Sequence, residues 1–138
     1  MESKTITLVQ ESFEKVKPIA PTAAKIFYSK LFELDPALEP LFPTDKEGAM
    51  VEQGNKLMTM LAAAVAGLSN LDALLPVLKD LGKRHVEYKV EPSHYNTVGA
   101  ALIGTLEAGL GNDFTPDVKE AWTSVYGTMS TVMIEAAY

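Results

Sequence analysis

Residues 74–85 read LLPVLKDLGKRH, a stretch that sets one histidine within a helical pattern of leucines. The histidine and three of the leucines follow one another at steps of four, three and four: Leu74, Leu78, Leu81 and His85. This spacing belongs to one face of a helix, and the leucines predict that the face is turned toward the core. A buried imidazole is usually satisfied by a backbone carbonyl, but imidazole is also a common metal ligand, so both roles remain open for His85.

Helical spacing recurs on both sides of this stretch. Apolar residues repeat at steps of three and four in five further segments, at 6–16, 24–34, 53–68, 95–109 and 121–132. Alternating β-branched runs between tight turns, which are typical of strands, are almost absent. The fold class is therefore predicted to be all-α, with six substantial helices and some short ones.

Prolines predict most of the helix boundaries, because proline suits the first turn of a helix and disrupts its interior. Five of them are expected to bend the first helix or to begin later ones: Pro18, Pro21, Pro36, Pro92 and Pro116. The helix that begins at Pro36 is expected to be short and to end near Phe42. Pro76 is expected to divide its segment into a short preliminary turn and the helix that carries His85.

Composition predicts one globular domain over residues 1–138. The chain is long enough to bury a single core, and its 47% hydrophobic and 22% charged residues exclude disorder over the whole length. A formal charge of -6 argues against a nucleic-acid partner. The absence of cysteine excludes disulfides and thiolate metal sites, which leaves two histidines as the main nitrogen ligands.

Two features of the chain predict a cytoplasmic location. The longest apolar run, residues 57–68 with Thr59 inside it, falls short of the roughly 20 residues that cross a bilayer, so no membrane span is expected. The first five residues, MESKT, lack the basic and apolar segments of a secretory signal.

A second inward polar group precedes His85 by 32 residues. Gln53 shares the apolar side of its predicted helix with Leu57 and Met60, which turns its amide toward the interior. Two inward polar groups on different helices suggest a cavity. A haem protein that binds a gas needs this combination, an imidazole on one side of the iron and a hydrogen-bonding group on the other.

Five short motifs carry a resemblance to a known family: FYSKLF (27–32), PLF (40–42), LGKRH (81–85), SHYNTVG (93–99) and AWTSVYG (121–127). Each motif is weak alone. Their order and mutual spacing together resemble the bacterial single-domain haemoglobins and the globin domain of flavohaemoglobins, over nearly the whole chain. The resemblance implies a globin fold, a three-over-three helical sandwich around a haem pocket, with haem b as the cofactor.

The resemblance also implies roles for individual residues. His85 is the implied iron ligand, and Tyr28, Gln53 and Leu57 are the residues implied to face the gas on the opposite side. Leu57 is also expected among the haem contacts, together with Phe42, Lys56, Met60, Arg84, Val90, Tyr95, Val98, Leu102 and Tyr126. Of these, Arg84 is expected to meet a haem propionate.

The chain departs from the family pattern in its last helix. Flavohaemoglobins place a glutamate there against the iron-bound imidazole, and this chain has Ala137 at the matching position. Glu135 lies two residues earlier, which turns its side chain by about 200° toward another face. His85 is therefore expected to donate its N–H to a backbone carbonyl, which makes the imidazole a weaker electron donor and disfavours peroxidase-like chemistry. His94 is expected to contact solvent or a propionate rather than the iron.

Two functions from different classes fit this pocket. As a binding protein, the chain would hold dioxygen reversibly for storage, transport or sensing, and it would also bind carbon monoxide. As an enzyme, it would oxidise nitric oxide to nitrate with dioxygen, a detoxification that requires a separate reductase because no flavin- or nicotinamide-binding motif is visible. A helical domain without haem would leave Tyr28, Gln53 and His85 as coincidences. A monomer or a weak homodimer is expected.

Overall fold

The computed structural model describes residues 3–41, 48–87 and 91–137. These residues form six α-helices and three short 3-10 helices, and no strand occurs among them. The α-helices are α1 (Ser3–Val16), α2 (Ala20–Leu34), α3 (Ala49–Gly67), α4 (Leu71–Glu87), α5 (Pro92–Leu110) and α6 (Pro116–Ala137). The 3-10 helices are η1 (Lys17–Ile19), η2 (Pro36–Leu41) and η3 (Gly111–Asp113). The all-α prediction is confirmed.

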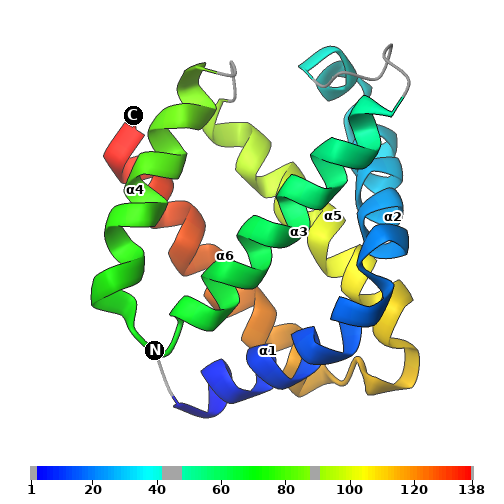
Figure 1. Ribbon diagram of the computed structural model, residues 1–138, viewed down its shortest axis with the longest axis vertical. Coiled ribbons are helices and arrows are strands. Elements are labelled where there is room, and N and C mark those ends of the chain that lie inside the picture. Colours follow the sequence, from blue (N-terminus) through cyan, green and yellow to red (C-terminus); the bar gives the residue numbers. More distant parts are fainter. Residues whose placement is uncertain (1–2, 42–47, 88–90, 138) are drawn as a thin grey trace.

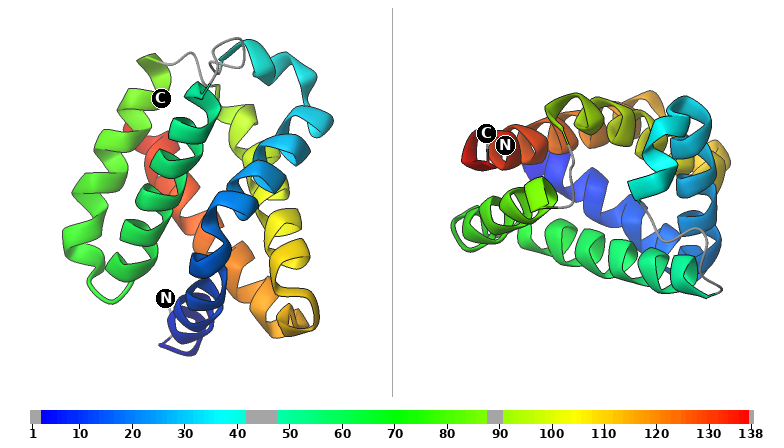
Figure 2. Two further views of the ribbon diagram at one scale, coloured as in Figure 1. Left: turned by 45° about the vertical axis from the view of Figure 1, so that its right-hand side comes forward. Right: turned by 90° about the horizontal axis from the view of Figure 1, so that it is seen from above.

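The helices are arranged in a layered sandwich (Figure 1). Seen from above, α3 and α4 lie on one side of the molecule and α5 and α6 lie on the other, with α2 at one end (Figure 2). The main packing partner of α2 is α5, and the main partner of both α1 and α4 is α6. This arrangement is consistent with the three-over-three helical sandwich that the resemblance implies. None of the six helices, over the residues described, could serve as a membrane span.

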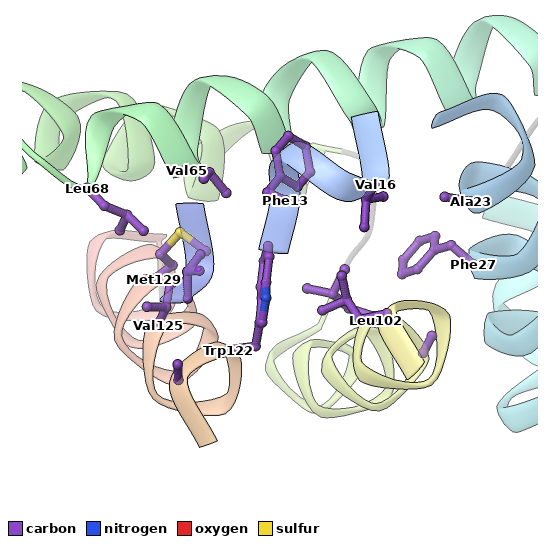
Figure 3. Close-up of a cluster of buried hydrophobic side chains, with 14 of the residues drawn as sticks. Phe13, Val16, Ala23, Phe27, Val65, Leu68, Leu102, Trp122, Val125 and Met129 are labelled. Carbon is purple, nitrogen blue, oxygen red and sulfur yellow. The ribbon is translucent and has the colours of Figure 1, made fainter. Parts of the chain in front are cut away.

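Trp122 lies at the centre of the apolar core, where its side chain is 0% exposed (Figure 3). Its ring centroid is 6.2 Å from that of Phe13, and the same cluster includes Val65 of α3 and Leu68, the residue after α3. The indole N–H donates a 2.7 Å hydrogen bond to Ser12 Oγ, whose hydroxyl donates to the Val9 carbonyl at 3.0 Å. The polar atom of the tryptophan is therefore satisfied inside the core, which removes the cost of burying it.

Most helix boundaries follow the expected local chemistry. The first helix ends at Val16, and η1, which contains Pro18, turns the chain before α2. α5 is followed by Gly111, whose φ of 56° favours glycine. Thr115 Oγ1 accepts the N–H of Val118 at 3.2 Å and caps the start of α6. The short segment after Asp35 is a 3-10 helix rather than an α-helix.

Pro76 does not divide its helix, so that expected boundary is wrong. α4 runs without interruption from Leu71 to Glu87 and contains Pro76 in its second turn. Proline lacks the N–H that would bond the carbonyl of Asp72, but both residues are exposed, and water can satisfy that carbonyl. Leu74 and Leu78 are buried on either side of the proline and hold both parts of the helix against the core.

Candidate functional site

Tyr28 and Gln53 meet where α2 crosses α3. The crossing is close because α3 has a glycine there: a Cβ added to Gly54 would lie 2.9 Å from the Cβ of Ala24. Gly54 is the neighbour of Gln53, and Ala24 lies one helical turn before Tyr28. The close approach of the two backbones therefore brings the phenol and the amide together.

Gln53 lies near enough to the Tyr28 hydroxyl to influence its ionisation. Tyr28 is buried, with 7% of its surface exposed, and Gln53 is half-buried. Burial raises the pKa of Tyr28 from its ordinary value of 10.0, and the Gln53 side chain lowers it by less. The phenol is therefore protonated at neutral pH and retains an O–H donor. That these residues face a bound gas from one site stays a prediction.

His85 lies on α4, half-buried, with its Nδ1 atom 2.7 Å from the carbonyl oxygen of Leu81. A carbonyl oxygen only accepts hydrogen bonds, so Nδ1 carries the proton and Nε2 carries the lone pair. A neutral imidazole with its lone pair on Nε2 is a suitable iron ligand. The expected hydrogen bond from His85 to a backbone carbonyl is confirmed.

Tyr95 contacts the histidine from α5. Its ring centroid is 6.0 Å from that of His85, and only 6% of its surface is exposed. Tyr126, on α6, donates its hydroxyl to the backbone carbonyl of Tyr95 at 2.6 Å. Gly99 makes room for this contact, because a Cβ there would lie 2.7 Å from Tyr126 Cε2. α6 therefore helps to hold Tyr95 beside the imidazole.

The remaining expected haem contacts differ in their burial. Leu102 is buried, whereas Leu57 and Val98 are partly buried and pack against the core. Met60 is half-buried on α3. Phe42 and Val90 lie outside the described residues.

The two basic residues among the expected haem contacts are exposed. Arg84 forms a 2.9 Å ion pair with Asp80, one turn earlier on α4, and Lys56 projects from α3. An exposed ion pair of this kind contributes about 0 to 1 kcal/mol, so the pairing with Asp80 leaves the guanidinium able to exchange partners. Contact of Arg84 with a propionate stays a prediction.

His94 has a structural role at the start of α5. Its Nδ1 atom accepts the backbone N–H of Glu91 at 3.0 Å, while the Glu91 side chain accepts the backbone N–H of His94. The two residues thus form a reciprocal cap of the helix N-terminus. This arrangement explains a histidine so close to His85 without a role as a second ligand.

Glu135 is exposed on α6, and Ala137 is half-buried. Neither residue supplies the carboxylate that flavohaemoglobins place against the iron-bound imidazole.

These residues together fit a haem. One imidazole is the protein ligand of haem iron in globins, and the phenol and amide supply hydrogen bonds of the kind that a gas-binding pocket uses. Each of the three side chains comes from a different helix, α2, α3 or α4.

Sequence reasoning missed the glycines that set the spacing of these helices. Gly54 and Gly99 permit the contacts described above, and Gly82 brings α4 against the backbone of α6. The available signal was a glycine in the interior of a helical pattern, which usually has a packing reason. The sequence does not reveal which helix lies opposite each glycine.

Comparison with known proteins supports the same fold. The globin family model matches residues 25–133, well over half of the chain. The chain is also similar to the flavohemoprotein of Bacillus subtilis (strain 168), with 27% identity over 134 residues. That similarity covers 97% of this chain but 33% of the relative, so the chain spans about one third of the length of the curated relative that it matches. The chain therefore belongs to the globins, the family whose helices pack around a haem pocket.

Proposed function

We propose that this globin binds haem b through His85 and holds dioxygen reversibly on the side of Tyr28 and Gln53. The observation that carries the proposal is the close crossing of α2 and α3 at Ala24 and Gly54, which places Tyr28 and Gln53 next to each other from different helices. A buried phenol beside a half-buried amide, with apolar residues on the same helices, forms a site that suits a small polarisable ligand.

When it is bound, the haem supplies an iron atom that can bond a diatomic gas. The protein contributes the orientation of the groups around it. On one side, the Leu81 carbonyl accepts the Nδ1 proton of His85 and so fixes the ring plane and the tautomer. On the other side, the protonated Tyr28 donates a hydrogen bond to the ligand, and Gln53 orients the phenol.

The hydrogen bond from Tyr28 favours dioxygen over carbon monoxide, because dioxygen is the better acceptor. A hydrogen bond to a charged acceptor contributes about 1.5 to 3 kcal/mol, which corresponds to roughly ten- to hundredfold in affinity. Leu57 and Leu102, which are expected beside the haem and pack in or against the apolar core, would exclude water that otherwise competes for the donor.

The partner of the His85 N–H also favours binding over oxidising chemistry. A neutral carbonyl is a weaker hydrogen-bond acceptor than a carboxylate, so it raises the basicity of the imidazole less. His85 therefore donates less electron density to the metal.

A second candidate is the oxidation of nitric oxide to nitrate with dioxygen, with electrons from a separate reductase. It is favoured by the similarity to a flavohemoprotein, of which this chain spans one third. The two functions share one pocket and differ in whether the iron is reduced again after each turnover.

Two measurements on the purified, haem-loaded protein test the proposal. Absorption spectra should show a ferrous protein that gives distinct complexes with dioxygen and carbon monoxide. Stopped-flow mixing of the dioxygen complex with nitric oxide, with and without NADH and an added flavin reductase, separates the candidates. Slow dioxygen release without reductase-dependent nitrate production supports storage or transport, and sustained nitrate production with the reductase supports the enzyme. A protein that takes up no haem contradicts both.

A further inference from the structure

The backbone of α4 lies directly on the backbone of α6 three residues before His85. A Cβ added to Gly82 would lie 2.5 Å from the carbonyl oxygen of Met133, 2.9 Å from its Cα and 3.0 Å from its carbonyl carbon. Gly82 is buried, and α6 is the main packing partner of α4. In Figure 1, α4 and the C-terminal part of α6 meet at the upper left.

This contact differs in kind from the other close glycine contacts. At Gly54 and Gly99, the atoms that a Cβ would meet belong to side chains, Ala24 and Tyr126. At Gly82 they are all backbone atoms of one residue in the middle of a helix turn, which cannot rotate away. A side chain at this position therefore has to move the whole of α4 away from α6.

The same helix face of α6 also positions the residue that flanks the imidazole. Tyr126 and Met133 are seven residues apart, which places them on one face of α6, two turns from each other. Tyr126 holds Tyr95 of α5 through its hydroxyl, and Met133 holds Gly82 of α4 through its backbone. α6 therefore contacts both the residue whose ring flanks His85 and the turn of α4 that precedes His85.

We propose that Gly82 is a positioning residue for His85, and that its missing side chain sets the distance of the imidazole from the centre of the pocket. The inference rests on the proposed role of His85 as the haem ligand. Raising the closest contact from 2.5 Å to an ordinary 3.4 Å requires a displacement of about 0.9 Å. The Leu81 carbonyl and His85 would move together with α4, away from Tyr95, which α6 retains.

Gly82→Ala tests the proposal, with Gly127→Ala as the matched control. Gly127 is also helical, on α6, and a Cβ there meets nothing within 4 Å. Both variants add one methyl group to a helix and gain the same helix propensity. They differ in their surroundings, because Gly82 is buried against backbone atoms of α6 and Gly127 is exposed on α6.

The readouts are the iron–histidine stretching frequency of the ferrous protein, from resonance Raman spectra, and the rate of haem transfer to an acceptor apoprotein. Gly82→Ala should lower and broaden the iron–histidine band and raise the rate of haem loss by about tenfold, because a misplaced ligand weakens the bond that it forms. Gly127→Ala should leave both unchanged. If Gly82→Ala does not fold, the double variant Gly82→Ala/Gly127→Ala, which adds helix propensity, replaces it.

Each result has a distinct meaning. A Gly82→Ala protein with the parent's iron–histidine band and haem loss overturns the positioning role and leaves the proposed function intact. If the variant is less stable but its iron–histidine band is unshifted, Gly82 acts in packing alone, and the positioning role is also overturned. A parent protein that binds no haem overturns the proposed function and this inference together.

Discussion

The hydroxyl of Tyr126 donates a 2.6 Å hydrogen bond to the backbone carbonyl of Tyr95 and thereby joins α6 to the first turn of α5. The ring of Tyr95 contacts His85, so this one bond connects the last helix to the neighbour of the candidate iron ligand. Burial is the main cause that raises the pKa of Tyr126, and the nearby Tyr95 raises it further.

Replacement of this donor should loosen Tyr95 without removing the haem. Tyr126→Phe keeps the ring over Gly99 and deletes the hydroxyl, so the free energy of unfolding should fall by about 0.5 to 1.5 kcal/mol, the net contribution of a neutral hydrogen bond. Denaturant titration of the parent and the variant measures the loss. Equal stabilities would mean that water replaces the hydroxyl at the Tyr95 carbonyl.

Tyr28→Phe should release dioxygen roughly ten- to hundredfold faster than the parent, because it loses one hydrogen bond to the ligand. Carbon monoxide binding should change little, since that ligand accepts hydrogen bonds poorly. Gln53→Leu should have a smaller effect of the same sign if the amide acts by orienting the phenol. Stopped-flow dissociation of dioxygen measures both, and unchanged rates in the two variants would show that neither side chain reaches the ligand.

The two histidines should differ sharply when each is replaced by alanine. His85→Ala should lose the iron–histidine band and most of its haem, because it removes the imidazole whose ring contacts that of Tyr95, whereas the His94 ring bonds the Glu91 backbone. His94→Ala should retain the haem spectrum and lose about 1 kcal/mol of stability, because it removes half of the helix cap with Glu91. Absorption and resonance Raman spectra distinguish them, and the reverse pattern would exchange the two assignments.

Gly54→Ala should destabilise the protein by about 1 to 3 kcal/mol, the usual cost of overpacking, because the new methyl group meets the Cβ of Ala24 at 2.9 Å. Dioxygen release should also accelerate, since α2 and α3 separate and Tyr28 moves from Gln53. Ala24→Gly removes the opposing atom, so the cost of Gly54→Ala should shrink in that background. A double-mutant cycle with no coupling would contradict the contact.

Stability should decline in alkaline solution through the buried tyrosines. The pKa values of Tyr28 and Tyr126 are raised above the ordinary 10.0, so above about pH 10 the unfolded chain releases protons that the folded chain retains. The free energy of unfolding is therefore unaffected by these groups below that pH and falls as the pH rises above it. Tyr28→Phe should show a shallower decline between pH 10 and 11 in denaturant titrations, and an identical slope would indicate that Tyr28 ionises normally.

Local patterns in the sequence are sufficient to predict the class of fold and the order of its helices. Periodic apolar residues and prolines act locally, within one or two helical turns, so the starts of α5 and α6 could be placed at Pro92 and Pro116 before any tertiary contact was known. The inward direction of His85 also follows from local spacing, because the leucines on its face define the buried side. Its hydrogen bond to Leu81, four residues earlier, lies within the same turn and could be expected for that reason.

Contacts between distant segments of the chain cannot be predicted from local spacing. Pro76 was expected to break its helix on local grounds, but burial of Leu74 and Leu78 against the core keeps α4 continuous across it. The contact of Gly82 with Met133 joins segments 51 residues apart, and no sequence pattern near either residue predicts it. Periodicity shows which face of a helix is buried, whereas the partner of that face and its distance depend on how all the helices pack together.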